Sequence, residues 1–112
     1  MAYTSRIKYE TIRSIDSSTF TGSYQALGTP LINPAAIIRI VNQSGVNVTL
    51  STDGVNDMDI VPTKDEVTYE YTANTPFSNP GGEYEPAETQ YLIKGSASTG
   101  LVYLIAQYIV HG

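Results

Sequence analysis

The stretches Val46-Asn-Val-Thr-Leu-Ser51 and Val67-Thr-Tyr-Glu-Tyr-Thr72 alternate apolar and polar residues. A period of two places successive side chains on opposite faces of a strand, so both stretches predict β-strands with one buried face. Just upstream, Ala36–Val41 is rich in β-branched residues, which pack well on a pleated surface, and it predicts a central strand. Sustained helical spacing of apolar residues is absent, so we expect no helix longer than two turns.

Two further strands are predicted near the C-terminus, at Tyr91–Lys94 and Leu101–Val110. The small residues and terminal glycines of Gly95–Gly100 favour a hairpin between them. Because Leu101–Val110 is apolar on both faces, we expect it to lie in the centre of a sheet.

Weaker strands are predicted at Thr11–Ile15 and Phe20–Ala26, separated by a turn at Asp16–Thr19. Prolines then interrupt the chain at Gly28–Pro30 and Asn33–Pro34. The sequence thus predicts an all-β fold class. We expect a single-domain two-sheet β-sandwich or small β-barrel with about six to eight short antiparallel strands. Its 112 residues suit one domain, residues 1–112.

The composition argues against several classes of protein. The formal net charge is −5, which is not the basic balance that nucleic-acid binding requires. Cysteine is absent, which excludes disulfides, thiolate zinc sites and a thiol nucleophile. The N-terminus lacks an apolar signal stretch, and Leu101–Val110 is about half of the ~20 residues that a helical membrane span needs. We therefore expect synthesis in the cytosol, no membrane and no nucleic acid.

Candidates for catalysis are few. The only imidazole belongs to His111, near the end of the chain, where a general base is difficult to hold in position. Gly95–Gly100 lacks the following lysine of a phosphate-binding loop. Carboxylate pairs such as Asp65/Glu66 fall in predicted turns or loops, where acidic residues are normally solvated. We expect no enzyme, no catalytic residues and no cofactor.

A metal site is weighed at Asp53-Gly-Val-Asn-Asp57-Met-Asp59, which gathers three carboxylates within seven residues. Calcium favours such oxygen ligands, but the spacing is not that of an EF-hand. The pattern favours an acidic hairpin with Asp53-Gly54 at its corner. We predict no metal site and keep calcium binding by Asp53, Asp57 and Asp59 as the alternative.

Residues 74–88 hold three prolines and two glycines without strand alternation. Loops of this length are uncommon in compact domains and are often functional. Phe77 and Tyr84 are its apolar side chains, so the loop either folds back on its own sheets or contacts another protein.

Charge is distributed unevenly along the chain. Residues 1–40 carry four basic residues against two acidic ones, whereas residues 53–88 carry nine acidic residues against one lysine. We expect residues 1–9 to form an extended arm. If the arm reaches a second copy, complementary charges would steer a homo-oligomer; pairing within one chain is the alternative. The candidate contact residues of the arm are Arg6, Lys8 and Tyr9.

Tyrosine dominates the aromatic content, with nine tyrosines, two phenylalanines and no tryptophan. Tyrosine combines an apolar face with a polar tip, which suits half-buried sheet surfaces, protein interfaces and sugar-binding faces. We expect most tyrosines to lie in the core and on the sheet surface, with glycan stacking as the alternative.

Between Ser23 and Ala73 the chain carries a series of strand and turn motifs. They are Tyr24-Gln-Ala-Leu-Gly-Thr-Pro-Leu-Ile-Asn-Pro34, Ile37-Ile-Arg-Ile-Val-Asn42, Val48-Thr-Leu-Ser-Thr-Asp-Gly-Val-Asn-Asp57, Val61-Pro62 and Tyr69-Glu-Tyr-Thr-Ala-Asn74. Together they resemble small virion proteins of tailed bacteriophages, over about half of the chain. The resemblance implies a β-rich structural protein of the virion, without cofactor or catalysis.

We therefore expect a non-enzymatic virion protein, with capsid decoration or stabilisation through protein contacts as the favoured role. A neck, head-tail connector or tail ring component is one alternative. A carbohydrate-binding module on a host-recognition appendage is the other. The expected partners are copies of the chain itself and a capsid or neck/tail protein.

Overall fold

The structure is a computed structural model that describes residues 5–70 and 85–111. Within these ranges the regular structure is nine β-strands and one 3-10 turn, η1 (Ser17–Thr19), without an α-helix. The strands form two antiparallel sheets, which confirms the predicted all-β, two-sheet fold. No helix in the described ranges has the length and apolarity that crossing a membrane requires.

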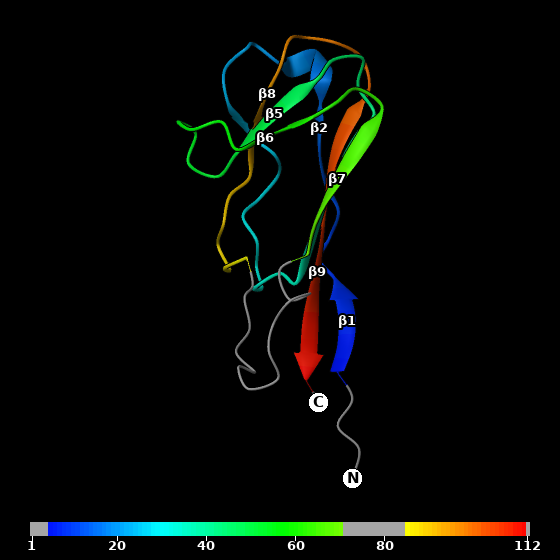
Figure 1. The fold of residues 1–112 in the computed structure, drawn as a ribbon, viewed down its shortest axis with the longest axis vertical. Helices are drawn as coiled ribbons and strands as arrows, with labels where there is room; N and C mark the ends of the chain where they lie inside the picture. The colour runs from blue at the N-terminus through cyan, green and yellow to red at the C-terminus, as the bar shows by residue number, and fades with distance from the viewer. Residues whose placement is uncertain (1–4, 71–84, 112) are drawn as a thin grey trace.

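The larger sheet has five strands (Figure 1). Its order is β1 (Ser5–Tyr9), β9 (Leu101–His111), β4 (Ile37–Asn42) and β7 (Asp65–Glu70), and β2 (Arg13–Asp16) also pairs with β9. β1 and β2 pair with successive parts of β9, on the side opposite β4. Both strands that the sequence predicts to be central, β4 and β9, therefore have neighbours on two sides.

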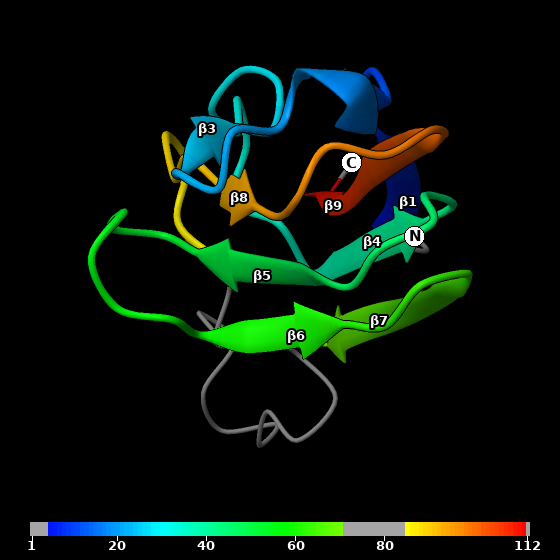
Figure 2. The ribbon, with the colours of Figure 1, turned by 90° about the horizontal axis from the view of Figure 1, so that it is seen from above.

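The smaller sheet has four strands (Figure 2). Its order is β3 (Gln25–Ala26), β8 (Leu92–Lys94), β5 (Val48–Ser51) and β6 (Asp59–Val61). β5 and β6 form the predicted acidic hairpin. The chain passes from the larger sheet to the smaller one between β4 and β5, and returns between β6 and β7.

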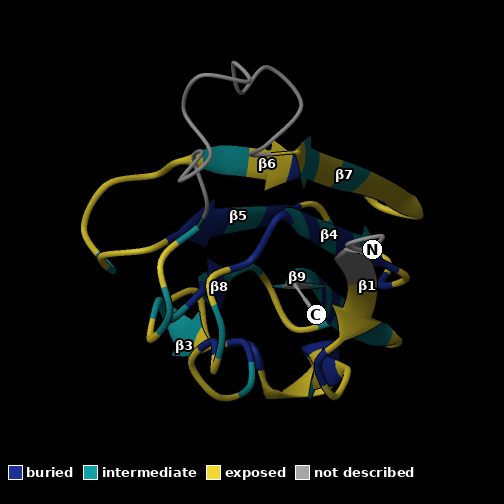
Figure 3. Cartoon of the chain, turned by 90° about the horizontal axis from the view of Figure 1, so that it is seen from below, coloured by how far each residue is buried: buried dark blue, intermediate teal, exposed yellow. Residues whose placement is uncertain are grey.

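Apolar side chains from both sheets form one core. Figure 3 colours the chain by burial, and buried residues occur on strands of both sheets. Burial alternates along β4: Ile38, Ile40 and Asn42 are buried, whereas the intervening residues are half-exposed. β9 alternates in the same way from Leu101 to Ala106, and β5 buries Val48, Leu50 and Ser51. The largest fully buried apolar side chains are Tyr91, Leu27, Leu31, Ile38, Ile40, Leu50, Ile93, Leu104, Val48, Val61 and Val102.

The predicted hairpin across Gly95–Gly100 is wrong. β8 pairs with β3 and β5, whereas β9 belongs to the other sheet. The loop crosses between the sheets because its backbone bonds to segments elsewhere: the Ser98 amide donates to the Ser17 carbonyl, and the Thr99 carbonyl accepts from the Gly45 amide. Gly95 packs closely against the buried Phe20 ring.

The predicted strand over Phe20–Ala26 is correct only at its end. Phe20 is a core residue, and Gly22 adopts a φ of +86°, which interrupts an extended strand. Only Gln25 and Ala26 pair, with β8. The predicted strand over Thr11–Ile15 likewise begins two residues later, at Arg13.

Candidate protein-contact surfaces

The five-stranded sheet buries one face in the core, and its other face combines apolar residues with the charged residues Arg39, Glu66 and Glu70. Residues paired directly across antiparallel strands share a face, so Ile7 lies beside Ile109, and Tyr9 lies in one row with Gln107 and Ile37. Ile7 is 55% exposed and Tyr9 is 64% exposed. The half-buried apolar residues of this outer face are Ile37, Val41, Leu101, Tyr103, Ile105 and Ile109.

The candidate arm residues lie in strand β1. Lys8 and Tyr9 are exposed, and Arg6 pairs with Val110 of β9 in the strand register. Residues 5–9 therefore form a strand on their own chain, while contact with a neighbour stays a prediction. The candidate loop residues Phe77 and Tyr84 fall outside the described residues.

The two outer strands of the larger sheet differ in charge. β1 contains Arg6 and Lys8 and no acidic residue, whereas β7 contains Asp65, Glu66 and Glu70 and no basic one. Among the described strands, none pairs with the outer side of either. Arg39 of β4 forms a half-exposed ion pair with Glu66 at 2.8 Å, so part of the acidic segment is paired within the chain.

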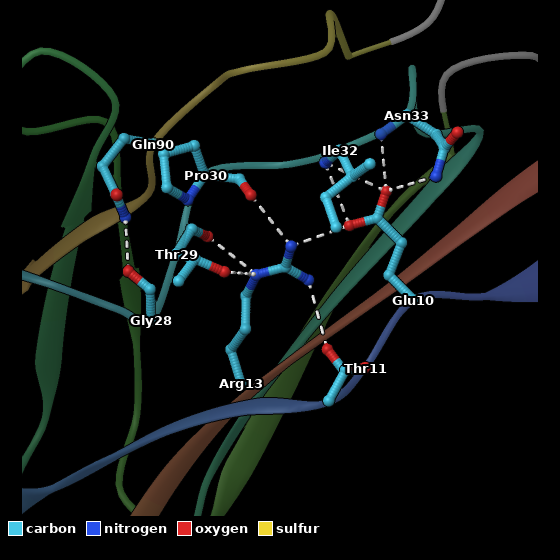
Figure 4. Close-up of polar contacts among 9 residues, drawn as sticks. All are labelled: Glu10, Thr11, Arg13, Gly28, Thr29, Pro30, Ile32, Asn33 and Gln90. Atoms are coloured by element: carbon cyan, nitrogen blue, oxygen red, sulfur yellow. Dashed lines mark hydrogen bonds and ion pairs between the residues drawn. The ribbon is translucent and has the colours of Figure 1, made fainter.

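Glu10 and Arg13 form a buried ion pair at the break between β1 and β2 (Figure 4). Arg13 Nη2 lies 2.8 Å from Glu10 Oε1, and the guanidinium also donates to the carbonyls of Thr29, Pro30 and Thr11. The Glu10 carboxylate accepts from the backbone amides of Ile32 and Asn33 and from the Asn33 side chain. The pair therefore fastens residues 29–33 to the edge of the larger sheet.

The surroundings of Glu10 favour its charged form. Burial by itself would raise the pKa of Glu10, but hydrogen bonds from the Asn33 and Ile32 amides and from Arg13 outweigh it. The pKa is consequently lower than the ordinary value of 4.5. Gly28 contributes space, since a Cβ at that position would lie 2.4 Å from the Arg13 Cβ.

The acidic hairpin between β5 and β6 is organised by Asp53. Its carboxylate accepts from the amides of Val55 and Asn56, the Asn56 side chain and the Ser51 hydroxyl. These bonds, led by the Val55 amide, hold the pKa of Asp53 far below its ordinary value. The hydrogen-bonding capacity of the Asp53 carboxylate is therefore used within its own loop.

Asp57 and Asp59 bond to groups outside the hairpin. Asp57 accepts from the Tyr24 hydroxyl and pairs with Lys94 Nζ at 3.0 Å, and Lys94 lies 4.6 Å above the centre of the Tyr24 ring. Asp59 accepts from the Tyr69 hydroxyl. In the ranges that the structure describes, no three His, Cys, Asp or Glu side chains gather as metal ligands.

The described tyrosines lie in different environments. Tyr91 is fully buried in the core, and Tyr69 packs against the core at its edge. Tyr24 takes part in the cluster with Asp57 and Lys94. Among the described tyrosines, Tyr9 is the one that stands out as strongly exposed.

Sequence reasoning missed the Glu10–Arg13 pair and the cluster of Tyr24, Asp57 and Lys94. From the sequence, Glu10 and Arg13 are only charges of a polar segment. Most of their partners are backbone groups of residues 29–33, and composition does not reveal such contacts. A charged pair three residues apart, followed by a Gly-Thr-Pro turn, is the only signal the sequence offers. The second cluster spans two loops and a strand, and it had no local signal.

No known protein family, curated protein or solved structure matches this chain.

Proposed function

We propose that this chain is a non-enzymatic structural protein of a tailed-phage virion that decorates and stabilises the capsid through protein contacts. The observation that carries the proposal is the group of apolar residues on the outer face of the five-stranded sheet, around β1 and β9. That face has Ile7 and Tyr9 at more than half exposure, beside a row of half-buried aliphatic and aromatic residues. Contiguous apolar surface of this kind marks interaction sites on soluble proteins.

The position of this face suits contact with a large partner. Strands β1, β9 and β4 all contribute to it, and their side chains project from a hydrogen-bonded sheet rather than from loops. Backbone order is already present, so a partner does not have to offset the entropy of folding it. On this face Arg39 and Glu66 pair with each other, so an extended protein surface such as a capsid shell can cover it without separating that pair.

The sequence motifs give independent support for the virion assignment. The stretch that resembles small virion proteins, Ser23–Ala73, runs from before β3 to beyond β7 and so includes strands of both sheets. Its Ser-x-Asp-Gly motif forms the β5–β6 loop, which Asp53 closes with its own hydrogen bonds. The resembling residues thus build the scaffold of the domain.

The charged clusters support a structural role. The Glu10–Arg13 pair forms hydrogen bonds with backbone groups of residues 29–33. Asp53 accepts hydrogen bonds from backbone amides of its own hairpin loop. Each cluster is therefore explained by the fold that it stabilises.

The test uses virions produced by the genome that encodes this chain. Deletion of its gene should give particles that lack the protein and lose DNA more readily on heating, and added purified protein should bind them and restore stability. Particles that never contained the protein would contradict the proposal. Tailless heads, with the protein present in few copies per particle, would instead place it in the neck or tail.

Two variants locate the contact. Ile7→Asp combined with Tyr9→Asp should abolish binding of the purified protein to deleted particles. Ile60→Asp is the matched control, because Ile60 is 56% exposed but lies on the smaller sheet. It should bind like the unaltered chain. Equal binding by all three proteins would refute a contact through the larger sheet.

A further inference from the structure

One end of the larger sheet narrows to a ribbon of two strands. β4 pairs with β9 only as far as Gln107, whereas β1 pairs with β9 from Gln107 to His111. Figure 1 shows β1 and this part of β9 at the opposite end of the molecule from β5, β6 and β8. Among the described strands, β9 is the one partner of β1, so the other edge of β1 is unpaired. Because two strands alone are marginally stable, this edge is a site where a further strand would stabilise the sheet.

The side chains along β1 alternate in chemistry. Ile7 and Tyr9 lie on the outer face of the larger sheet and are more than half exposed. Lys8 is also exposed and lies on the opposite face, because successive residues of a strand alternate between faces. A strand added to this edge therefore meets apolar groups on one face and a cation on the other.

The charge of Lys8 is not compensated. Of the lysine and arginine side chains that the structure describes, Lys8 is the one with neither an ion pair nor a hydrogen bond. The others bond to a carboxylate or to a backbone carbonyl, and they are Arg13, Arg39, Lys64 and Lys94. Strands β1 and β9 contain no acidic residue, and the nearby Glu10 is buried in its pair with Arg13. The edge thus favours a partner that brings its own carboxylate.

A second copy of β1 does not fit this edge. Antiparallel pairing of two β1 strands about Ile7 would place position 6, an arginine, directly opposite Lys8 of the other copy. Like charges directly opposite each other destabilise a strand pair. The charge of β1 therefore disfavours a symmetric dimer and favours a different, acidic segment.

We propose that β1 accepts an extended acidic segment of the capsid partner as an additional strand of the larger sheet. Apolar residues of that segment lie beside Ile7 and Tyr9, and an alternate acidic residue lies beside Lys8. Backbone hydrogen bonds supply most of the affinity in such strand addition, and the side chains supply the specificity. One exposed ion pair contributes little by itself, so Lys8 selects the segment rather than holding it. The inference rests on the proposed function and names the chemistry of its contact.

The experiment uses the purified full chain and a blocked seven-residue peptide of alternating valine and glutamate. The fluorescently labelled peptide should bind saturably at low salt, and it should slow amide hydrogen exchange in residues 5–9. Two altered peptides serve as controls, one with lysine in place of every glutamate and one with proline in place of the central valine. Both should bind at least fivefold more weakly, because the first opposes Lys8 and the second loses a backbone donor.

Charge reversal on the protein tests the role of Lys8. Lys8→Glu should weaken binding of the valine-glutamate peptide at least fivefold and strengthen binding of the valine-lysine peptide. Lys64→Glu is the matched control, since it reverses one exposed charge in the turn before β7 and should leave both affinities unchanged. Circular dichroism checks that both variants keep the fold.

Three results would each overturn the proposal. They are absence of binding by the valine-glutamate peptide, equal binding of all three peptides, and binding that leaves the amides of β1 unprotected. Equal weakening by Lys8→Glu and Lys64→Glu would overturn it as well, since it would show attraction to net charge alone.

Particles that lack the protein separate this inference from the proposed function. Peptide binding by a chain that is missing from virions would refute the virion function and leave strand addition at β1 intact. A protein that is present on virions, and whose Lys8→Glu variant binds deleted particles as well as the unaltered chain does, would refute the strand addition and leave the virion function intact.

Discussion

At the scale of single residues, the Glu10–Arg13 pair carries the most concentrated set of interactions in the described chain. Both side chains are nearly inaccessible, at 2% and 6% exposure, and their remaining hydrogen-bonding groups are largely satisfied by backbone atoms. A buried pair of this kind is costly to break, since removal of one partner leaves the other charge buried without compensation.

Arg13→Met should lower the free energy of unfolding by about 3–5 kcal/mol, because Glu10 would then stay buried without its cation. Arg39→Met is the matched control. It removes the half-exposed partner of Glu66 and should cost only ~0–1 kcal/mol. Urea unfolding of the three proteins measures both values. Similar losses in the two variants would show that the Glu10–Arg13 pair is no stronger than a surface pair.

The lowered pKa of Glu10 makes this contribution dependent on pH. Because the folded state holds the carboxylate below its ordinary pKa of 4.5, the stabilisation is present above that pH and is lost as the pH falls toward the folded-state pKa. The difference in unfolding free energy between the unaltered chain and Glu10→Gln should be constant near neutrality and shrink below about pH 4.5. A difference that does not change with pH would contradict the charged state assigned to Glu10.

At the scale of elements, the crossing from β8 to β9 depends on Gly100. Its φ is +101°, and a Cβ there would lie 2.4 Å from the Gln43 carbonyl oxygen. Without a side chain, Gly100 can lie against the backbone of Gln43, in the segment after β4. The chain then enters β9 of the larger sheet at Leu101.

Gly100→Ala should destabilise the protein by at least ~1–3 kcal/mol, since it combines an unfavourable φ with a clash against backbone. Gly22→Ala is the control, with a φ of +86° but open space around the added Cβ. Its loss of stability should come only from the unfavourable φ. Thermal unfolding compares the two, and an equal effect would mean that the contact with Gln43 relaxes without cost.

Much of this element level could be predicted from the sequence. Alternation located β5 and β7, β-branched residues located β4, and a continuous apolar run located β9. The reason is that β4, β5 and β9 bury residues in the core, and Val67 and Tyr69 of β7 pack against it. The acidic hairpin followed from Asp53-Gly54 and was confirmed.

The connections and the candidate contacts were harder to predict. Whether β8 and β9 pair depends on the hydrogen bonds of Ser98 and Thr99 to Ser17 and Gly45, which are distant in sequence. Lys8 and Tyr9 are candidate contact residues from the sequence and both are exposed, while contact itself stays a prediction. That they lie on a strand of the larger sheet could not be predicted, because the register of β1 is set by β9 more than ninety residues away.

At the scale of the whole molecule, β1 is an edge strand whose exposed residues contribute little to the core. A chain that begins at Glu10 keeps the buried Glu10–Arg13 pair and all core residues. We expect it to melt within a few degrees of the full chain and to bind more weakly to particles that lack the protein. Calorimetry and a particle-binding assay measure the two properties. Equal loss of folding stability and association would show that β1 is part of the folding unit rather than a contact strand.

The central claim is that the chain binds a capsid through the outer face of its larger sheet. A cryo-electron microscopy map of virions from the genome that encodes the chain tests this claim most directly. The account predicts repeated copies of the two-sheet domain on the capsid, with the outer face of the larger sheet covered. A map in which the domain is absent, or in which that face is open to solvent, would contradict it.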